Sequence, residues 1–319
     1  MQGKYEWVPT ATAPSEFPAY TMIGFLGFQN GSTVRLPGDN VTASGWGETG
    51  AIELIEPRFK PIPVSLDAVW FSVIESKFYH ATFKLPLQLV ESTFAAGFRA
   101  PPGEEPTPIS RVIVGYAPGG DVAVWARGGR VVHMLGMFKA QEVNMRVSEL
   151  IKNPDMSEQD FINDCLKGII TDQRLREIKS SPLPLGHWAD LDRRYNWFPY
   201  LRGEYSEILI WVKGANGEQD WFAQGADNAV TTSATKQLPR PDVLNASWKM
   251  KNGRQYVARI QFSLPHLTKA FDALHTQQPG SNIHMEMMIG DIEPRISILL
   301  RNGNQVVPLR EISYTVNAR

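Results

Sequence analysis

The stretch PVSLDAVW at residues 63–70 returns as PDVLNASW at residues 241–248, and this pair decides how the fold is interpreted. Each stretch ends in a tryptophan, and a tyrosine follows at nearly the same distance, at Tyr79 and Tyr256. Self-similarity of this kind indicates an internal repeat, which constrains the architecture more than any single motif does. The sequence therefore predicts two related units.

Further matches occur in the same order along both halves of the chain. They pair residues 4–9 with 194–199, Asn30-Gly31 with Asn216-Gly217, Phe94 with Phe271, and residues 127–129 with 301–303. The offset between partners drifts slowly, as changes in loop length would produce. We interpret the chain as a tandem duplication of residues 1–142 and 194–319, with residues 143–193 between the copies.

Both copies follow one pattern of elements. Alternating hydrophobicity and turn residues predict strands at 21–28, 78–85, 111–116, 121–126 and 131–138, and at 208–213, 256–262, 284–289, 295–301 and 306–309. Apolar residues three and four apart predict one helix per copy, through Leu87, Val90, Phe94 and Phe98 and through Leu267, Ala270, Phe271 and Leu274. The predicted class is α+β, an antiparallel sheet with one packed helix in each copy.

The segment between the copies, residues 143–193, predicts an ordered helical insert. Ser157 followed by Asp160 is a typical helix N-cap pattern. An apolar stripe that includes Cys165 predicts one helix over about residues 157–179, with the thiol on its buried face. A second, shorter helix is expected near residues 146–152, and the prolines at 182 and 184 end the helical run.

Composition excludes several classes of protein. The 319 residues carry 32 Lys and Arg against 33 Asp and Glu, so the formal net charge is −1 at pH 7. A general nucleic-acid binder needs a basic surplus, which this chain lacks. No apolar run reaches the roughly 18 residues of a membrane-spanning helix, and the first residues do not read as a signal peptide. The single cysteine excludes a cysteine-based zinc cluster.

No motif for catalysis, a metal or a cofactor stands out. Residues 45–50, GWGETG, match the alternating glycines of a dinucleotide-binding loop, but no helix is predicted after them, which favours a glycine-rich loop. The six histidines form no pair spaced two or four residues apart, so no local metal pair exists. We expect no catalytic residue, no metal and no cofactor.

The candidate residues for binding a protein partner lie in polar or loop-like stretches. They are Trp46, Glu48, Glu104, Glu105 and Trp188. An exposed tryptophan often anchors a protein interface, although core filling is the simpler explanation for Trp46 and Trp188. Glu104 and Glu105 lie in the proline-rich loop 101–108, for which a solvated loop is the simple alternative.

Several motifs resemble those of a known bacterial family. They are YEW at 5–7, WFS at 70–72, ExKFY at 75–79, VGYAPGG at 114–120 and RRYNW at 193–197. Together they resemble the domain-of-unknown-function family 2931 over roughly residues 1–200, and the second copy is a weaker echo. Members are often lipoproteins whose lipobox signal is missing from this sequence.

The resemblance implies a non-enzymatic role. Genes of this family often lie near type VI secretion effectors, notably phospholipase-like toxins, which suggests an immunity protein that binds and neutralises its cognate toxin. The expected location is the periplasm if a lipoprotein signal has been removed, and otherwise the cytoplasm. Membrane contact is expected only through a lipid anchor absent from this chain.

Two alternatives remain open at this stage. A cell-envelope scaffold or ligand-binding lipoprotein would use the same fold with an apolar groove. A hydrolase would need carboxylates and histidines brought together in one cleft.

Overall fold

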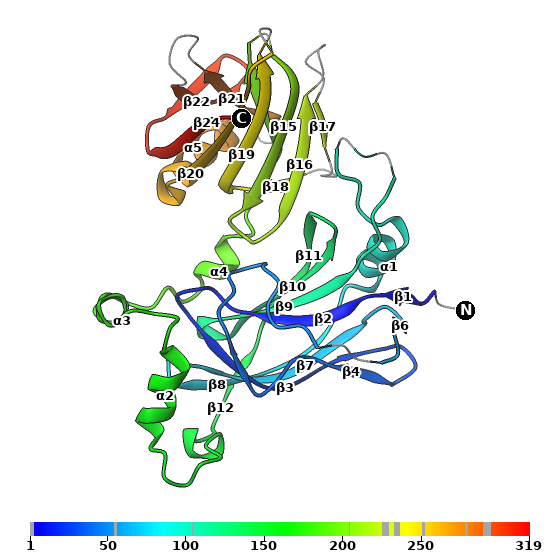
Figure 1. Ribbon diagram of the computed structural model, residues 1–319, viewed down its shortest axis with the longest axis vertical. Coiled ribbons are helices and arrows are strands. Elements are labelled where there is room, and N and C mark those ends of the chain that lie inside the picture. The colour runs from blue at the N-terminus through cyan, green and yellow to red at the C-terminus, as the bar shows by residue number, and fades with distance from the viewer. Residues whose placement is uncertain are drawn as a thin grey trace. The chain divides into compact units, whose positions relative to one another are not determined.

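The chain folds into two compact units in the computed structural model (Figure 1). Unit 1 comprises Met1–Gly97 and Thr107–Asp190, and unit 2 comprises Phe98–Pro106 and Leu191–Arg319. The structure describes residues 3–53, 56–101, 103, 105–203, 205–224, 230–232, 237–250, 253–277, 280–289 and 295–319. Strands dominate and a few helices accompany them, which confirms the predicted α+β class.

Unit 1 contains two main sheets, a small two-stranded sheet of β1 and β6, one helix between strands and a helical segment at its end. Its strands are β1 (Tyr5–Glu6), β2 (Val8–Thr12), β3 (Ala19–Gly27), β4 (Thr33–Arg35), β5 (Asn40–Thr42), β6 (Phe59–Lys60), β7 (Ser65–Ser72), β8 (Lys77–Lys84), β9 (Arg111–Ala117), β10 (Asp121–Gly128), β11 (Val131–Lys139) and β12 (Gln141–Val143). Its helices are α1 (Leu87–Ala96), α2 (Glu158–Leu166), α3 (Asp172–Lys179) and the short α4 (His187–Asp190).

The two sheets of unit 1 pack face to face. Strands β2, β9, β10 and β11 pair in that order, and β12, β8, β7, β3 and β4 form the second sheet, with β5 beside β3. Stacked rings join the layers: Trp70 lies 4.6 Å from Tyr116, and Phe83 lies 4.8 Å from Phe138, between ring centroids. Pairing is antiparallel except that β2 runs parallel to β9, because a crossover rather than a hairpin connects them.

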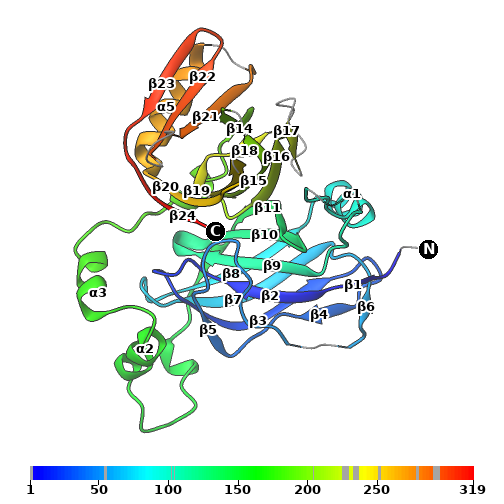
Figure 2. The ribbon, with the colours of Figure 1, turned by 45° about the horizontal axis from the view of Figure 1, so that its top comes forward.

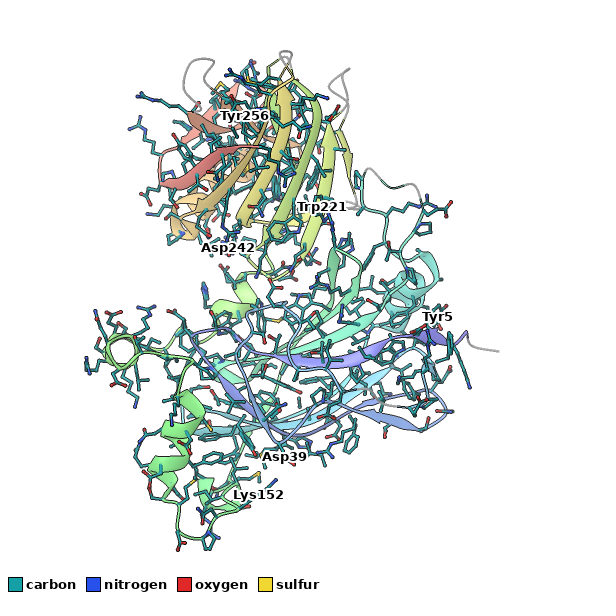
Figure 3. All side chains as sticks on the ribbon, viewed as in Figure 1. Tyr5, Asp39, Lys152, Trp221, Asp242 and Tyr256 are labelled. Atoms are coloured by element: carbon teal, nitrogen blue, oxygen red, sulfur yellow. The ribbon has the colours of Figure 1, made fainter. Side chains whose placement is uncertain are left out.

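The helical insert covers the outer face of the second sheet. That face is apolar at Phe71 and Phe78, and the buried side of α2 packs on it through Phe161 and Cys165. Charged contacts fasten the insert at two further places. Arg174 Nε lies 2.6 Å from Glu16 Oε1, and Lys152 Nζ lies 3.7 Å from Asp39 Oδ2 (Figure 3).

The expected single helix at 157–179 is wrong in its continuity. Helix α2 ends at Leu166, because Gly168 has a φ of +74° that a helix does not allow. Thr171 then caps a new helix, α3, by accepting a hydrogen bond from the Arg174 amide at 3.2 Å. The helix expected near 146–152 is only one turn of 3₁₀ helix, Val147–Glu149. The Ser157 N-cap is confirmed by its contact with the Asp160 amide.

Unit 2 contains two main sheets and one long helix. Its strands are β13 (Arg194–Tyr195), β14 (Trp197–Arg202), β15 (Tyr205–Gly214), β16 (Gln219–Gln224), β17 (Val230–Thr232), β18 (Leu238–Pro239), β19 (Pro241–Met250), β20 (Gln255–Phe262), β21 (Ile283–Ile289), β22 (Ile296–Asn302), β23 (Gln305–Leu309) and β24 (Ile312–Ala318), and its helix is α5 (Leu264–Gln277). Strands β16, β15, β19, β20 and β24 pair in that order, and β14, β21, β22 and β23 form the other sheet.

Helix α5 packs in the core of unit 2 against the inner face of the sheet formed by β14, β21, β22 and β23 (Figure 2). Its buried residues Leu267, Phe271 and Leu274 join Met285 of β21 and Leu300 of β22 in one apolar cluster. All pairings in this unit's two main sheets are antiparallel except that β14 runs parallel to β21. The α5 helix, with its predicted buried stripe, is confirmed.

A buried tryptophan has the same kinds of partner in each unit: Trp7, between β1 and β2, and Trp197, at the start of β14. Trp7 donates its indole N–H to the Pro61 carbonyl at 3.1 Å, and Trp197 donates to the Pro239 carbonyl at 2.9 Å. Each indole also meets the edge of a helix phenylalanine, at centroid distances of 6.1 Å and 5.8 Å. A buried N–H without a partner is costly, so each contact fixes where its helix and strand meet.

Replacing either indole by a ring without the donor should destabilise the protein. We expect Trp7→Phe and Trp197→Phe each to lower the free energy of unfolding by about 2 kcal/mol, because the proline carbonyl loses its partner and a cavity forms. Urea unfolding monitored by circular dichroism measures this. The control Tyr314→Phe, at an exposed position on β24, should change it by less than about 0.5 kcal/mol. An unchanged midpoint for both tryptophan variants would contradict the assigned role.

Burial makes the thiol of Cys165 unreactive. It raises the pKa of Cys165 to about 11, and the nearby Asp164 charge acts in the same direction. The thiolate is the reactive form, so at pH 8 we expect native labelling by a maleimide to be at least about 100-fold slower than labelling in guanidinium, where the pKa is ordinary. Equal rates in the two conditions would show that the α2 packing is not formed in solution.

Candidate functional site

One sheet face in unit 2 combines apolar and charged side chains and is only partly buried. It is the outer face of β14, β21, β22 and β23, opposite α5, and we call it the β21 face. Its members are Phe198, Tyr200, Arg202, His284, Glu286, Met288, Ser297, Leu299, Arg301, Val306 and Pro308. Tyr200, Met288 and Leu299 are half-buried, and Val306 is 41% exposed. A partly exposed apolar patch of this kind is typical of a binding surface.

An ion-pair triad lies at the centre of the β21 face. Glu286 is almost fully buried, its Oε2 lies 2.8 Å from Arg202 Nε, and its Oε1 lies 2.8 Å from Arg301 Nε. Burial alone would raise the pKa of Glu286, but the hydrogen bonds and charges of the two arginines outweigh it and hold this pKa below its ordinary value. The triad carries a net charge of about +1, because two guanidinium groups face one carboxylate.

Strands β14 and β23 are the two edges of the sheet that carries the β21 face. On β14, the side-chain amide of Gln224 accepts from the Leu201 N–H at 2.8 Å and donates to the Leu201 carbonyl at 2.9 Å. On β23, Pro308 is exposed and carries no N–H. The backbone of Leu201 at the β14 edge is therefore already hydrogen-bonded.

The predicted anchors Trp46 and Trp188 are buried in unit 1, 6% and 8% exposed. The Trp46 ring lies 4.8 Å from Trp125 and 5.4 Å from Trp188, between centroids. Gly115 makes room for this cluster, since a Cβ there would lie 2.5 Å from the Trp125 ring. Core filling, the simpler of the two alternatives, therefore describes both rings, and neither offers a free ring to a partner.

The residues around Trp46 form a segment that covers the outer face of β2, β9 and β10. We call residues 43–52 the covering segment. Thr10 Oγ1 donates to the Ala51 carbonyl at 2.7 Å, and Thr12 Oγ1 donates to the Gly45 carbonyl at 2.8 Å. No helix follows, which confirms the glycine-rich loop. Gly50 allows the close approach, because a Cβ there would lie 1.8 Å from the Ala11 carbonyl oxygen.

The three predicted glutamates have different outcomes. Glu48 is half-buried within the covering segment, where its charge acts on Arg127. Glu105 is exposed. Glu104 lies outside the described residues. Their role in binding a partner stays a prediction.

Three of the motifs that carry the resemblance, WFS at 70–72, ExKFY at 75–79 and VGYAPGG at 114–120, meet at one carboxylate in unit 1. Glu75 accepts hydrogen bonds from the Gly119 N–H at 3.0 Å, from Ser72 Oγ at 2.6 Å and from Tyr79 Oη at 3.0 Å. Burial, followed by the Glu75 charge, raises the pKa of Tyr79 above its ordinary value. A carboxylate with this many donors anchors the turn at 118–120.

Two features are absent from the described part of the chain, a group of metal ligands and a membrane-spanning helix. No group of three or more His, Cys, Asp or Glu side chains is arranged there to hold a metal ion. Among the same residues, no helix is both long and apolar enough to span a membrane.

Reasoning from sequence did not identify the β21 face. The strand predicted at 284–289 is confirmed, and its alternation already separated Met285 and Met287 from His284, Glu286 and Met288. The signal was therefore present: a strand with apolar residues on both faces needs a cover on each.

Comparison with known proteins yields one match. The family described as "Protein of unknown function (DUF2931)" matches residues 1–186, more than half of the chain. No curated protein and no solved structure matches the chain.

The triad makes unfolding dependent on pH. The folded-state pKa of Glu286 is depressed, so its contribution is present above the unfolded value of about 4.3 and is lost as the pH falls through the folded value. We expect Glu286→Gln to lower the free energy of unfolding at pH 7 by about 3 kcal/mol, since it leaves two arginines without their carboxylate. The difference from wild type should shrink between about pH 5 and pH 3.

Denaturant titrations across this pH range test the expectation. The matched control is Glu207→Gln, which removes an exposed partner of Lys249 and should change stability by less than about 0.5 kcal/mol. A difference for Glu286→Gln that does not vary with pH would contradict the assigned charge state.

Proposed function

Since the chain belongs to the DUF2931 family, whose function is unknown, we propose from its own structure that it is a non-enzymatic immunity protein. It binds and neutralises a toxin delivered by type VI secretion, and a phospholipase-like effector is the first candidate. A periplasmic location, where such a toxin would meet the envelope, belongs to the same proposal. The observation that carries it is the β21 face.

The β21 face has the composition of a protein-binding surface. Tyrosine, methionine and arginine are enriched at protein interfaces, and Tyr200, Met288, Arg202 and Arg301 contribute all three types. The face is built on paired strands rather than on loops. A rigid surface loses little conformational entropy on binding, so more of the contact energy remains as affinity.

A tandem duplication also belongs to this proposal, and the strand pairings support it. In unit 1, β2 pairs in parallel with β9, which continues to β10 and β11, whereas β3, β7 and β8 pair in another sheet. In unit 2, β14 pairs in parallel with β21, which continues to β22 and β23, whereas β15, β19 and β20 pair in another sheet. The helices α1 and α5 follow the corresponding strands β8 and β20.

Aromatic contacts at the matched sequence positions support the duplication further. Trp70 stacks on Tyr79 at 5.5 Å, and Trp248 stacks on Tyr256 at 5.7 Å, between ring centroids. In both cases the two residues face each other directly across a strand pair. Duplication followed by divergence would leave one copy free to acquire a binding surface.

Direct binding to the candidate toxin tests the proposed function. The full chain would be titrated by calorimetry with the purified toxin encoded beside its gene, and the toxin's lipase activity would be measured at each ratio. We expect a Kd in the nanomolar range, about −12 kcal/mol, and loss of activity at equimolar protein. Absence of binding to any neighbouring gene product would contradict the immunity role and would favour the envelope lipoprotein alternative.

A further inference from the structure

Much of the outer surface of the sheets is either covered by the chain or polar. In unit 1, helix α2 covers the face that contains Phe71 and Phe78, and the covering segment lies on that of β2, β9 and β10. In unit 2, the outer face of β19, β20 and β24 is polar, with Arg259 and Thr315 exposed. Half-buried apolar residues, Leu209, Trp211 and Trp221, lie on the same outer side of β15 and β16. The β21 face differs from them because it combines partly buried apolar residues with a charged triad.

The covered face of unit 1 and the β21 face correspond position by position. Trp125 of β10 faces Ile113 of β9, and Leu299 of β22 faces Glu286 of β21 in the same register. Thr10, Ile113 and Trp125 are 0% exposed beneath the covering segment. By contrast, Leu299 is half-buried and carries no comparable cover among the described contacts.

The covering segment shows which chemistry such a face accepts. It contributes one large aromatic ring, Trp46, which packs edge-on against Trp125 at 4.8 Å. It also carries a carboxylate, Glu48, whose charge favours the charged form of Arg127. The counterpart of Arg127 on the β21 face is Arg301, which faces Val306 as Arg127 faces Val132.

Charge at the β21 face points to the same kind of occupant. Arg202 and Arg301 side chains are 49% and 31% exposed, and Glu286 engages only part of each guanidinium. The arginines retain donors that an incoming carboxylate can use, because a guanidinium has five N–H groups. The net positive charge of the triad favours an acidic partner over a basic one.

We propose that the β21 face binds a protein segment that places one large aromatic side chain over Leu299 and Met288 and one carboxylate against Arg202 and Arg301. This inference rests on the proposed function and deepens it, because it names the chemistry of the toxin segment that is recognised. The occupant resembles the chain's own covering segment, with an aromatic residue two positions before an acidic one.

A peptide copy of the covering segment provides a direct probe. The labelled peptide ASGWGETGAI, residues 43–52, would be titrated with the full chain and followed by fluorescence anisotropy. We expect saturable binding with a Kd below about 1 mM, weakened at least about ten-fold by Trp46→Ala or Glu48→Gln in the peptide. No saturation, or equal binding by all three peptides, would overturn the proposal.

Variants of the full chain locate the binding. Leu299→Asp and Val306→Asp introduce a carboxylate on the β21 face, and Thr315→Asp introduces one on the polar face of unit 2 as the matched control. Both β21-face variants should lose peptide binding at least about ten-fold, while the control keeps it. Circular dichroism checks that each variant is folded. If Leu299→Asp does not fold, the result for Val306→Asp, at an exposed position, decides the test. If the folded β21-face variants bind the peptide as wild type does, the assignment is overturned.

Titration with the toxin distinguishes a failure of this inference from a failure of the proposed function. If the toxin does not bind the wild-type chain, the immunity role fails while the peptide result still decides the chemistry of the face. If the toxin binds wild type and the β21-face variants equally, the immunity role stands and the inference fails.

Discussion

A sheet buries one face in its own core, and the other face must be polar, covered by the chain, or left for a partner. This constraint explains why two segments outside the strands lie where they do. The helical insert and the covering segment both exist over apolar outer faces of unit 1. The exposed residues of β20 and β24 in unit 2 need no cover, because they are polar. On the β21 face, the apolar residues Tyr200, Met288 and Leu299 are left half-buried.

The sequence carried most of the fold, because strand and helix periods are local properties. Val90 and Phe94 of α1, and Leu267 and Phe271 of α5, are buried as their spacing predicts. The parallel pairing of β2 with β9 was missed, since it joins strands about a hundred residues apart and leaves no local pattern. The break between α2 and α3 was also missed, although Gly168 and Thr171 are the residues that cause it.

The candidate site was harder to predict, because burial depends on what packs from elsewhere. Trp46 stands among glycines and polar residues, which suggests a solvated loop, yet Gly115 and Gly50 allow its segment to lie flat on β2 and β9. Glu75 contacts Gly119, which lies 44 positions away in sequence, so no local pattern could reveal this contact. Conversely, the sequence does not mark Tyr200 and Leu299 as surface residues, since an isolated apolar residue in a strand usually faces a core.

The Gln224 amide on Leu201 has a consequence for how molecules of this protein meet one another. A β-sheet with a bare edge recruits further strands, and an apolar sheet with two bare edges is a template for fibre growth. Here the backbone of Leu201 is already bonded, and Pro308 has no N–H to offer at the opposite border. At these two positions, an additional strand would therefore find no free backbone N–H with which to pair.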